Sequence, residues 1–220
     1  MNLINLTPLE LVRKMDCLLV APQLSRQEID AGCELAVRSD CFAIIVKPHY
    51  IEHARKLLKE TRVKVISVVG FPHGSISTAA KMYEAQDILQ RGAEGIEMVV
   101  NIGGLRDHDD LVVKNDIVTV IKIARGHPVT VVLETGLLTD EEKTRACKIA
   151  EAAGATAIKT ATDFNPGIVV PDDVRLMRAT VTALSVIAAG RIATRDAARE
   201  MLEAGAVRIA SGEIAKIVSE

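Results

Sequence analysis

Residues 139–161 read TDEEKTRACKIAEAAGATAIKTA, and this stretch contains a helix, a turn and a strand in that order. Thr139 followed by Glu142 is the pattern of a capping box, which predicts that a helix begins there. Gly154 can adopt the left-handed conformation that ends a helix. The short run after it is apolar and rich in β-branched residues, which are typical of a strand. The stretch therefore predicts one unit with a helix over 139–153 and a strand over 156–161.

The same transition from helix to strand recurs along the chain. Gly92 and Gly205 also lie between an expected helix and an apolar run, and Ser25 with Glu28 forms a second capping box, while Thr194 begins another expected helix. The expected strands are 16–20, 42–47, 64–70, 95–101, 129–134, 156–161, 184–190 and 207–211. The expected helices are 25–39, 49–60, 78–91, 108–125, 139–153, 171–179, 194–204 and 212–219.

Eight alternating strands and helices predict an α/β fold, a (β/α)8 TIM barrel with a parallel eight-stranded sheet. The competing architecture is an open doubly wound sheet, which typically has a glycine-rich phosphate loop after its first strand. Here no glycine follows the first expected strand until Gly32. No break in composition divides the chain, so we expect residues 1–220 to form a single barrel domain.

The composition excludes several classes of function. Lys and Arg number 27 against 29 Asp and Glu, and aromatic residues are 2%, so nothing favours a nucleic acid or an anionic membrane as a partner. No apolar run approaches the roughly 18 to 20 residues that cross a bilayer, and the first residues lack the apolar core of a secretory signal. We therefore expect a cytoplasmic protein. The cysteines are not spaced as metal ligands, so we expect buried free thiols at Cys17, Cys33, Cys41 and Cys147.

Charged side chains within the expected strands are the strongest pointers to function. Strands of a parallel barrel are covered on both faces, and functional residues of such barrels gather at the carboxyl ends of the strands. Lys64 lies at the amino end of its strand, so we expect it on the opposite face of the barrel, which serves stability rather than chemistry. The other polar exceptions are Asp16, Lys47, Glu97, Asn101, Glu134, Lys159 and Arg208.

Lys159 is the candidate nucleophile among these residues. Its small and apolar neighbours favour a neutral amine, and such an amine can attack a carbonyl carbon and form a Schiff base. Glu97, two strands away, is placed to move the protons that this reaction requires. The alternative is a structural lysine that forms an ion pair with Glu97 or Glu134, because buried ion pairs produce the same pattern. Both interpretations stay open on spacing alone.

Six motifs lie along nearly the whole chain: VKVISVVGFPHG (63–74), GAEGIEMVVNIGGL (92–105), VVLETGLLTDEEK (131–143), AGATAIKTATDF (153–164), PDDVRLMR (171–178) and AGAVRI (204–209). Together they resemble the deoxyribose-phosphate aldolases of the DeoC type. The resemblance implies a metal-free class I aldolase, a lyase of carbohydrate catabolism without a cofactor, which reversibly cleaves 2-deoxy-D-ribose 5-phosphate to glyceraldehyde 3-phosphate and acetaldehyde. It implies that Lys159 forms the Schiff base, that Glu97 replaces the proton-relay aspartate, and that Asp16 is a further active-site residue.

Two departures from the family pattern concern the reacting lysine. The family has a second lysine on the seventh strand, whose charge helps to keep the nucleophile deprotonated, and Ile187 stands at that position here. Lys47 ends the second strand on the same face as Ile45. Our hypothesis is that Lys47 supplies the missing ammonium and belongs to the catalytic residues. A lysine that reaches solvent from the strand end is the alternative.

The expected substrate-binding residues carry further departures. The resemblance places a phosphate site at the ends of the seventh and eighth strands, where Arg191 would attract a phosphate and Glu213 would repel it. Asp163 stands where the family has a glycine and adds a negative charge. The alternatives are a rebuilt phosphate site, a different, unphosphorylated carbonyl substrate, and a non-catalytic barrel that binds a small ligand. The residues expected to bind substrate are Thr160, Gly190, Arg191, Ser211 and Gly212.

The expected partner is a small molecule, an aldehyde or a sugar phosphate. Members of the family often pair, so the resemblance implies that a homo-oligomer can form, whereas the sequence itself does not fix the oligomeric state.

Overall fold

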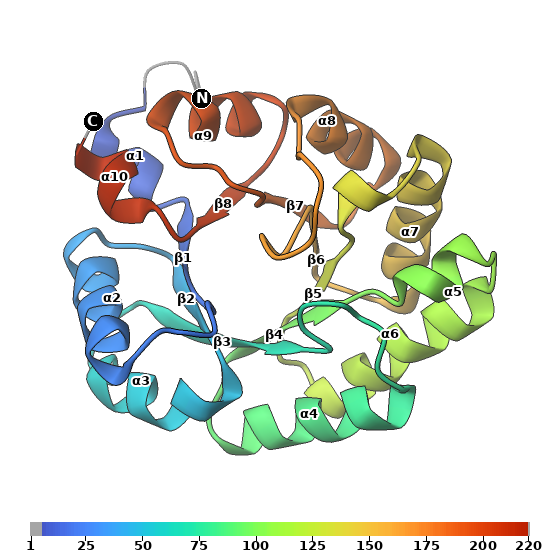
Figure 1. The fold of residues 1–220 in the computed structure, drawn as a ribbon, viewed down its shortest axis with the longest axis horizontal. Helices are drawn as coiled ribbons and strands as arrows, with labels where there is room; N and C mark the ends of the chain where they lie inside the picture. Colours follow the sequence, from blue (N-terminus) through green and yellow to red (C-terminus); the bar gives the residue numbers. More distant parts are fainter. Residues whose placement is uncertain (1–5, 220) are drawn as a thin grey trace.

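The computed structural model describes residues 6–219 and places them in a closed parallel barrel inside a ring of helices (Figure 1). Each strand pairs in parallel with the next along the chain, and the last strand pairs with the first. The (β/α)8 barrel expected from the sequence is therefore confirmed. The strands are β1 (Met15–Leu19), β2 (Ala43–Val46), β3 (Lys64–Val69), β4 (Gly95–Val99), β5 (Val129–Val132), β6 (Ala157–Lys159), β7 (Ser185–Ala188) and β8 (Arg208–Ser211).

The helices that cover the barrel agree with those expected, with ends that differ by a few residues. They are α2 (Arg26–Arg38), α3 (Ile51–Leu57), α4 (Thr78–Gln90), α6 (Asp110–Ala124), α7 (Asp140–Ala153), α8 (Pro171–Thr180), α9 (Arg195–Glu203) and α10 (Ile214–Ser219). The sequence analysis missed α1 (Pro8–Val12), α5 (Ile102–Arg106) and the 3₁₀ turns η2 (Pro48–Tyr50) and η3 (Thr135–Leu137). These elements are too short for a helical period to show, and α5 contains two glycines, which disfavour a helix.

The expected helix caps are present. Ser25 and Thr139 each form a complete capping box with the glutamate three residues later, and the hydroxyl of Thr194 accepts a hydrogen bond from the N–H of Ala197. Gly154 has a φ of 91°, in the left-handed region that favours glycine, and ends α7 as the sequence predicts. Local sequence signals therefore set the boundaries of these helices.

The strands separate two apolar regions. Side chains that point outward pack under the helices, and those that point inward fill the barrel. Several strands are shorter at their carboxyl ends than expected, because the chain leaves the ladder there and turns into the loops at the barrel mouth. The inward residues that form the interior cluster are Leu18, Val20, Ala43, Ile45, Ile66, Val68, Ala157, Ile187, Ala189 and Ala210.

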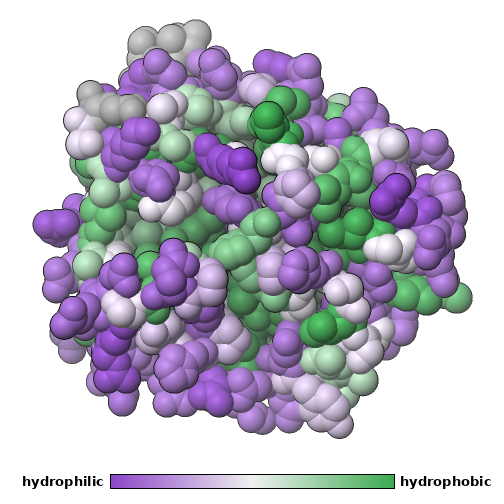
Figure 2. Space-filling model, in the orientation of Figure 1, coloured by the Kyte–Doolittle hydropathy of each residue, from purple (hydrophilic) through white to green (hydrophobic). Residues whose placement is uncertain are grey.

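The hydropathy of the molecular surface agrees with the composition of the sequence. On the face shown in Figure 2 the outer rim is largely hydrophilic, and hydrophobic side chains show between the rim and the centre. The four cysteines are free and buried, as expected. No helix within residues 6–219 combines the length and the apolar character needed to cross a membrane.

Candidate active site

Lys159 and Glu97 form a buried pair inside the barrel. Lys159 ends β6 and points inward like Ala157, while Glu97 points inward from β4, on the far side of β5. The Nζ of Lys159 donates a hydrogen bond to Oε2 of Glu97 over 2.8 Å, and the two side chains are only 1% and 2% exposed. The geometry shows the ion pair with Glu97 that the sequence analysis left open. The nucleophile beside a base, which would use the same two groups, stays a prediction.

Glu134, the other acid considered as a partner of Lys159, has a different role. It follows β5 in a left-handed conformation with a φ of 59°, and its Oε1 accepts a hydrogen bond from the backbone N–H of Thr162 over 2.6 Å. Burial raises the pKa of Glu134, and the hydrogen bonds from Thr162 oppose this shift. Glu134 therefore fixes the loop that follows β6, and Glu97 is the acid that pairs with Lys159.

Asp16, on β1, is a further charged side chain in the barrel interior. Its Oδ2 accepts a hydrogen bond from Nε of Arg208 over 3.1 Å, and its buried Oδ1 has no partner among the described residues. Burial raises the pKa of Asp16 to about 6; the charge of Arg208 opposes this shift, the charge of Glu97 adds to it, and that of Lys159 opposes it. Asp16 therefore lies within electrostatic range of Glu97 and Lys159 inside the barrel.

Lys47 lies just beyond the carboxyl end of β2, but its ammonium is already bound. Its Nζ donates hydrogen bonds to the carbonyl oxygens of Ala21 over 2.6 Å and of Pro22 over 3.0 Å, and it lies 5.5 Å from the centre of the Tyr50 ring. Among the described residues, no hydrogen bond or ion pair joins Lys47 to Glu97, the acid that pairs with Lys159. These contacts hold the loop between β1 and α2, which favours a structural role over the hypothesised catalytic one.

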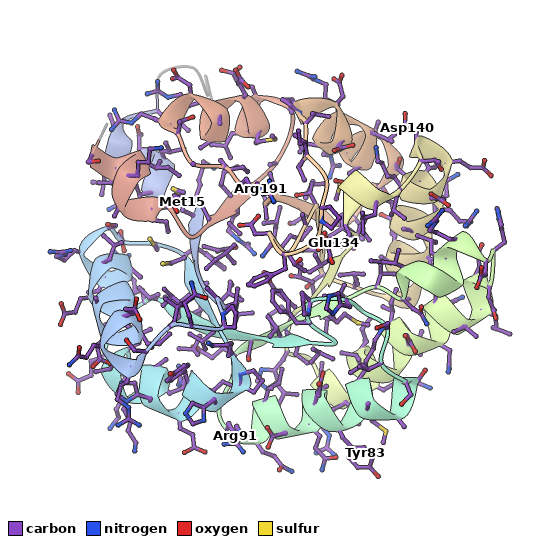
Figure 3. The ribbon with its side chains drawn as sticks, in the orientation of Figure 1. Met15, Tyr83, Arg91, Glu134, Asp140 and Arg191 are labelled. Atoms are coloured by element: carbon purple, nitrogen blue, oxygen red, sulfur yellow. The ribbon has the colours of Figure 1, made fainter. Side chains whose placement is uncertain are left out.

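Asp163 binds the loop that follows β7. The backbone N–H of Arg191 donates a hydrogen bond to Oδ1 of Asp163 over 2.9 Å. Burial raises the pKa of Asp163, whereas the N–H of Arg191, the charge of Lys159 and the N–H of Gly190 lower it, in that order. Figure 3 shows Arg191 toward the middle of the ring of helices. The sequence analysis noted the charge of Asp163 but not this contact, because the contact depends on how two loops fold against each other.

The other expected substrate-binding residues divide into two groups. Thr160 and Ser211 are buried and bonded internally: the hydroxyl of Thr160 donates to the carbonyl of Ala189 over 2.6 Å, and that of Ser211 donates to the carbonyl of Ile192 over 2.7 Å. Gly212, in contrast, is exposed at the end of β8. The mouth of the barrel therefore offers Gly212 and the Gly190 loop to a ligand more readily than the two hydroxyls.

Comparison with known proteins identifies the family of the chain. The model of the DeoC/LacD family of aldolases matches residues 17–212. The deoxyribose-phosphate aldolase of Thermococcus kodakarensis is 43% identical over 214 residues, which cover 95% of this chain and 96% of that protein. That of Bdellovibrio bacteriovorus is 39% identical over 202 residues, which cover 91% and 92%.

A solved structure shares the fold. The tetrameric deoxyribose phosphate aldolase of Aeropyrum pernix aligns with a TM-score of 0.90 and 24% identity, and the alignment covers 97% of this chain and 91% of that one. At this identity the similarity supports the barrel fold alone.

Proposed function

The chain belongs to the DeoC/LacD family of aldolases, and we propose that it is a class I aldolase that reversibly cleaves 2-deoxy-D-ribose 5-phosphate. The products are glyceraldehyde 3-phosphate and acetaldehyde. The observation that carries this proposal is the buried amine of Lys159, held 2.8 Å from the carboxylate of Glu97 inside the barrel. A buried lysine beside a base is the arrangement that an imine-forming enzyme requires.

The reaction begins with a proton transfer within the pair. When Glu97 takes a proton from Lys159, an ammonium and a carboxylate become an amine and a carboxylic acid with no change in net charge. The free amine adds to the C1 carbonyl carbon of the open-chain sugar, and the resulting carbinolamine loses water to give a protonated imine. Glu97 can return its proton to the departing hydroxyl, which is general acid catalysis by the same group.

The protonated imine then accepts the electrons of the breaking bond. Loss of the proton on the C3 hydroxyl is coupled to cleavage of the C2–C3 bond, which releases glyceraldehyde 3-phosphate and leaves an enamine on Lys159. Protonation at C2 and hydrolysis of the imine release acetaldehyde and regenerate the amine. Asp16 supports these proton transfers, since a carboxyl with a pKa of about 6 exchanges protons readily near neutral pH.

An activity assay with a matched control tests this function. Lys159→Met should abolish the release of acetaldehyde from 2-deoxy-D-ribose 5-phosphate, a loss of about 10⁴-fold or more in kcat. The control is Lys64→Met, because Lys64 pairs with Glu94 at the opposite end of the barrel and should tolerate the change. Full activity in Lys159→Met would refute the proposal.

An unphosphorylated 2-deoxy sugar is the second candidate substrate. One observation favours it: Asp163 places a carboxylate on the backbone N–H of Arg191 at the barrel mouth. Cleavage of such a sugar would use the same lysine and the same steps.

A further inference from the structure

A cavity of about 170 Å³ lies at the amino end of the barrel, opposite the end at which Lys159 terminates β6. Its lining comes from the amino-terminal parts of the strands, among them Ile66 of β3, Ile96 of β4, Thr130 of β5 and Arg208 of β8. A cavity of about 150 Å³ engineered in another protein holds benzene, so this one accommodates a molecule of about six non-hydrogen atoms. The proposed cleavage takes place at Lys159 and does not use this space.

Arg208 presents unused hydrogen-bond donors to this cavity. Its side chain is partly exposed, and its Nε donates a hydrogen bond to Oδ2 of Asp16 over 3.1 Å. The guanidinium carbon lies 4.1 Å from the centre of the ring of Phe42, which also lines the cavity. Among the described residues, no hydrogen bond uses Nη1 or Nη2 of Arg208. The N–H groups on these two nitrogens therefore remain free to bind a ligand.

Two hydroxyls and an apolar wall complete the lining of the cavity. The side-chain hydroxyls of Thr130 and Ser185 make no hydrogen bond to another described residue. Ile66, Ile96 and Pro128 form the apolar wall. A guanidinium matches the two oxygens of a carboxylate with paired hydrogen bonds, hydroxyls donate to the same oxygens, and an apolar wall favours a hydrocarbon tail. A phosphate dianion fits less well, because part of its charge would lie against apolar side chains.

The charges next to the cavity also favour an anion. Arg13 and Arg62 both pair with Asp40 at a surface that shares Phe42 with the cavity. Two basic groups on a single acid leave an excess of positive charge at this end of the barrel. Such an excess attracts an anion to the cavity.

We propose that this cavity binds a small monocarboxylate, with its carboxylate on the free N–H groups of Arg208 and its short hydrocarbon tail against Ile66 and Ile96. Arg208 links the site to the barrel interior, because the same guanidinium holds Asp16. The bound carboxylate and Asp16 share one cation, so each weakens the hold of Arg208 on the other, and this coupling is reciprocal. The site is separate from the reacting pair, and its existence does not depend on the proposed cleavage.

Butyrate is the probe, because it has the size and the chemistry that the cavity accepts, and butyramide is its uncharged control. A titration of the full chain at about pH 7.5, followed by NMR of the ligand, measures both dissociation constants. We expect a dissociation constant of about 0.1–5 mM for butyrate. Butyramide and inorganic phosphate should each bind at least about tenfold more weakly.

Four variants locate the bound carboxylate. Ser185→Leu fills the cavity and Arg208→Met removes the charged donors, so each should weaken butyrate binding at least about tenfold. Asp16→Asn removes the carboxylate that competes for Arg208 and should tighten binding about threefold or more. Lys159→Met is the control, because a carboxylate bound at the reacting amine would lose affinity in this variant, whereas binding in the amino-end cavity should change less than about twofold.

Unchanged butyrate binding in both Ser185→Leu and Arg208→Met would overturn the inference. Loss of binding in Lys159→Met would overturn it as well, since the carboxylate would then lie at the reacting amine. Equal affinities for butyrate and butyramide would contradict a carboxylate site, and tighter binding of phosphate would contradict the chemical class. An unchanged affinity in Asp16→Asn would contradict the sharing of Arg208.

Discussion

The Nζ of Lys159 and Oε2 of Glu97 lie 2.8 Å apart although their strands, β6 and β4, are separated by β5. Removal of two charges from water costs free energy that their attraction only partly repays, so a buried ion pair is weak evidence for stability. The chemical role of the pair is clearer, since the transfer of one proton from Lys159 to Glu97 yields the neutral amine that attacks a carbonyl carbon. We therefore interpret the pair as part of the reaction.

The role of Glu97 can be tested with an isosteric amide. Glu97→Gln keeps the shape of the side chain but cannot accept a proton from Lys159, so kcat for cleavage should fall about 10²- to 10⁴-fold, the usual contribution of a general base. Glu97→Asp should retain part of the activity, because it keeps the carboxylate. The measurement is kcat together with the rate of imine formation. A kcat for Glu97→Gln close to that of the unaltered enzyme would remove Glu97 from the mechanism.

Asp16 should make stability depend on pH in a defined direction. Its folded pKa of about 6 lies above the ordinary value of 3.8, so between these values the folded state binds a proton that the unfolded state releases. The contribution of Asp16 to the free energy of unfolding is therefore fully present below about pH 4. It is lost as pH rises through 6, and the total loss is about 3 kcal/mol. Asp16→Asn does not titrate and should lack this loss.

The comparison is made by urea unfolding of both proteins across this pH range. The free energy of unfolding of the unaltered protein, minus that of Asp16→Asn, should decrease as pH rises. A difference that stays constant would show that Asp16 titrates as it does in the unfolded chain.

Lys47 should matter for stability more than for chemistry. Lys47→Met removes two hydrogen bonds from a charged donor to the carbonyls of Ala21 and Pro22, each worth about 1.5–3 kcal/mol at most, so thermal stability should fall. The rate of imine formation on Lys159 should stay within about twofold, a change too small to reflect a lost catalytic group. A drop of two orders of magnitude in that rate would instead support the hypothesis that Lys47 replaces the ammonium missing at Ile187.

A second buried ion pair supports β4 from outside the barrel. The Nζ of Lys81, on α4, donates to Oδ2 of Asp116 over 2.7 Å and to the carbonyl of Val99 over 3.1 Å. Asp116→Asn leaves the ammonium without a countercharge and should lower the free energy of unfolding by about 3–5 kcal/mol. Replacing both residues, Lys81→Met with Asp116→Leu, should cost less than the single change. Chemical unfolding of the two variants measures how much free energy of unfolding each one loses. Equal losses in the single and the double variant would contradict this account.

The barrel and the buried pair of Lys159 and Glu97 could be predicted because they follow from simple periodicities. Alternation along a strand fixes which residues face inward, and strand order places Glu97 and Lys159 two strands apart. Lys81 was missed because a lysine on an amphipathic helix is usually exposed. Its spacing from Ala85 and Ile88, which are buried on the same face of α4, was the signal that could have found it.

The contact of Asp163 could not be predicted in the same way. Asp163 and Arg191 both have positive φ angles that residues other than glycine rarely adopt, so local preference argues against this loop geometry. Tertiary contacts overrule that preference, since the hydrogen bond between the two loops joins residues 28 positions apart. Similarly, Thr160 and Ser211 match substrate-binding positions in sequence, but their hydroxyls bond to neighbouring loops.

Borohydride reduction in the presence of acetaldehyde, followed by mass spectrometry of the peptides, tests the central claim most directly. Reduction of the imine fixes the two carbons of acetaldehyde to the amine that formed it. We expect a single reduced adduct on the peptide that contains Lys159, and its loss in Lys159→Met. An enzyme that cleaves the sugar while Lys159 stays unmodified, or an adduct on Lys47 instead, would contradict the account.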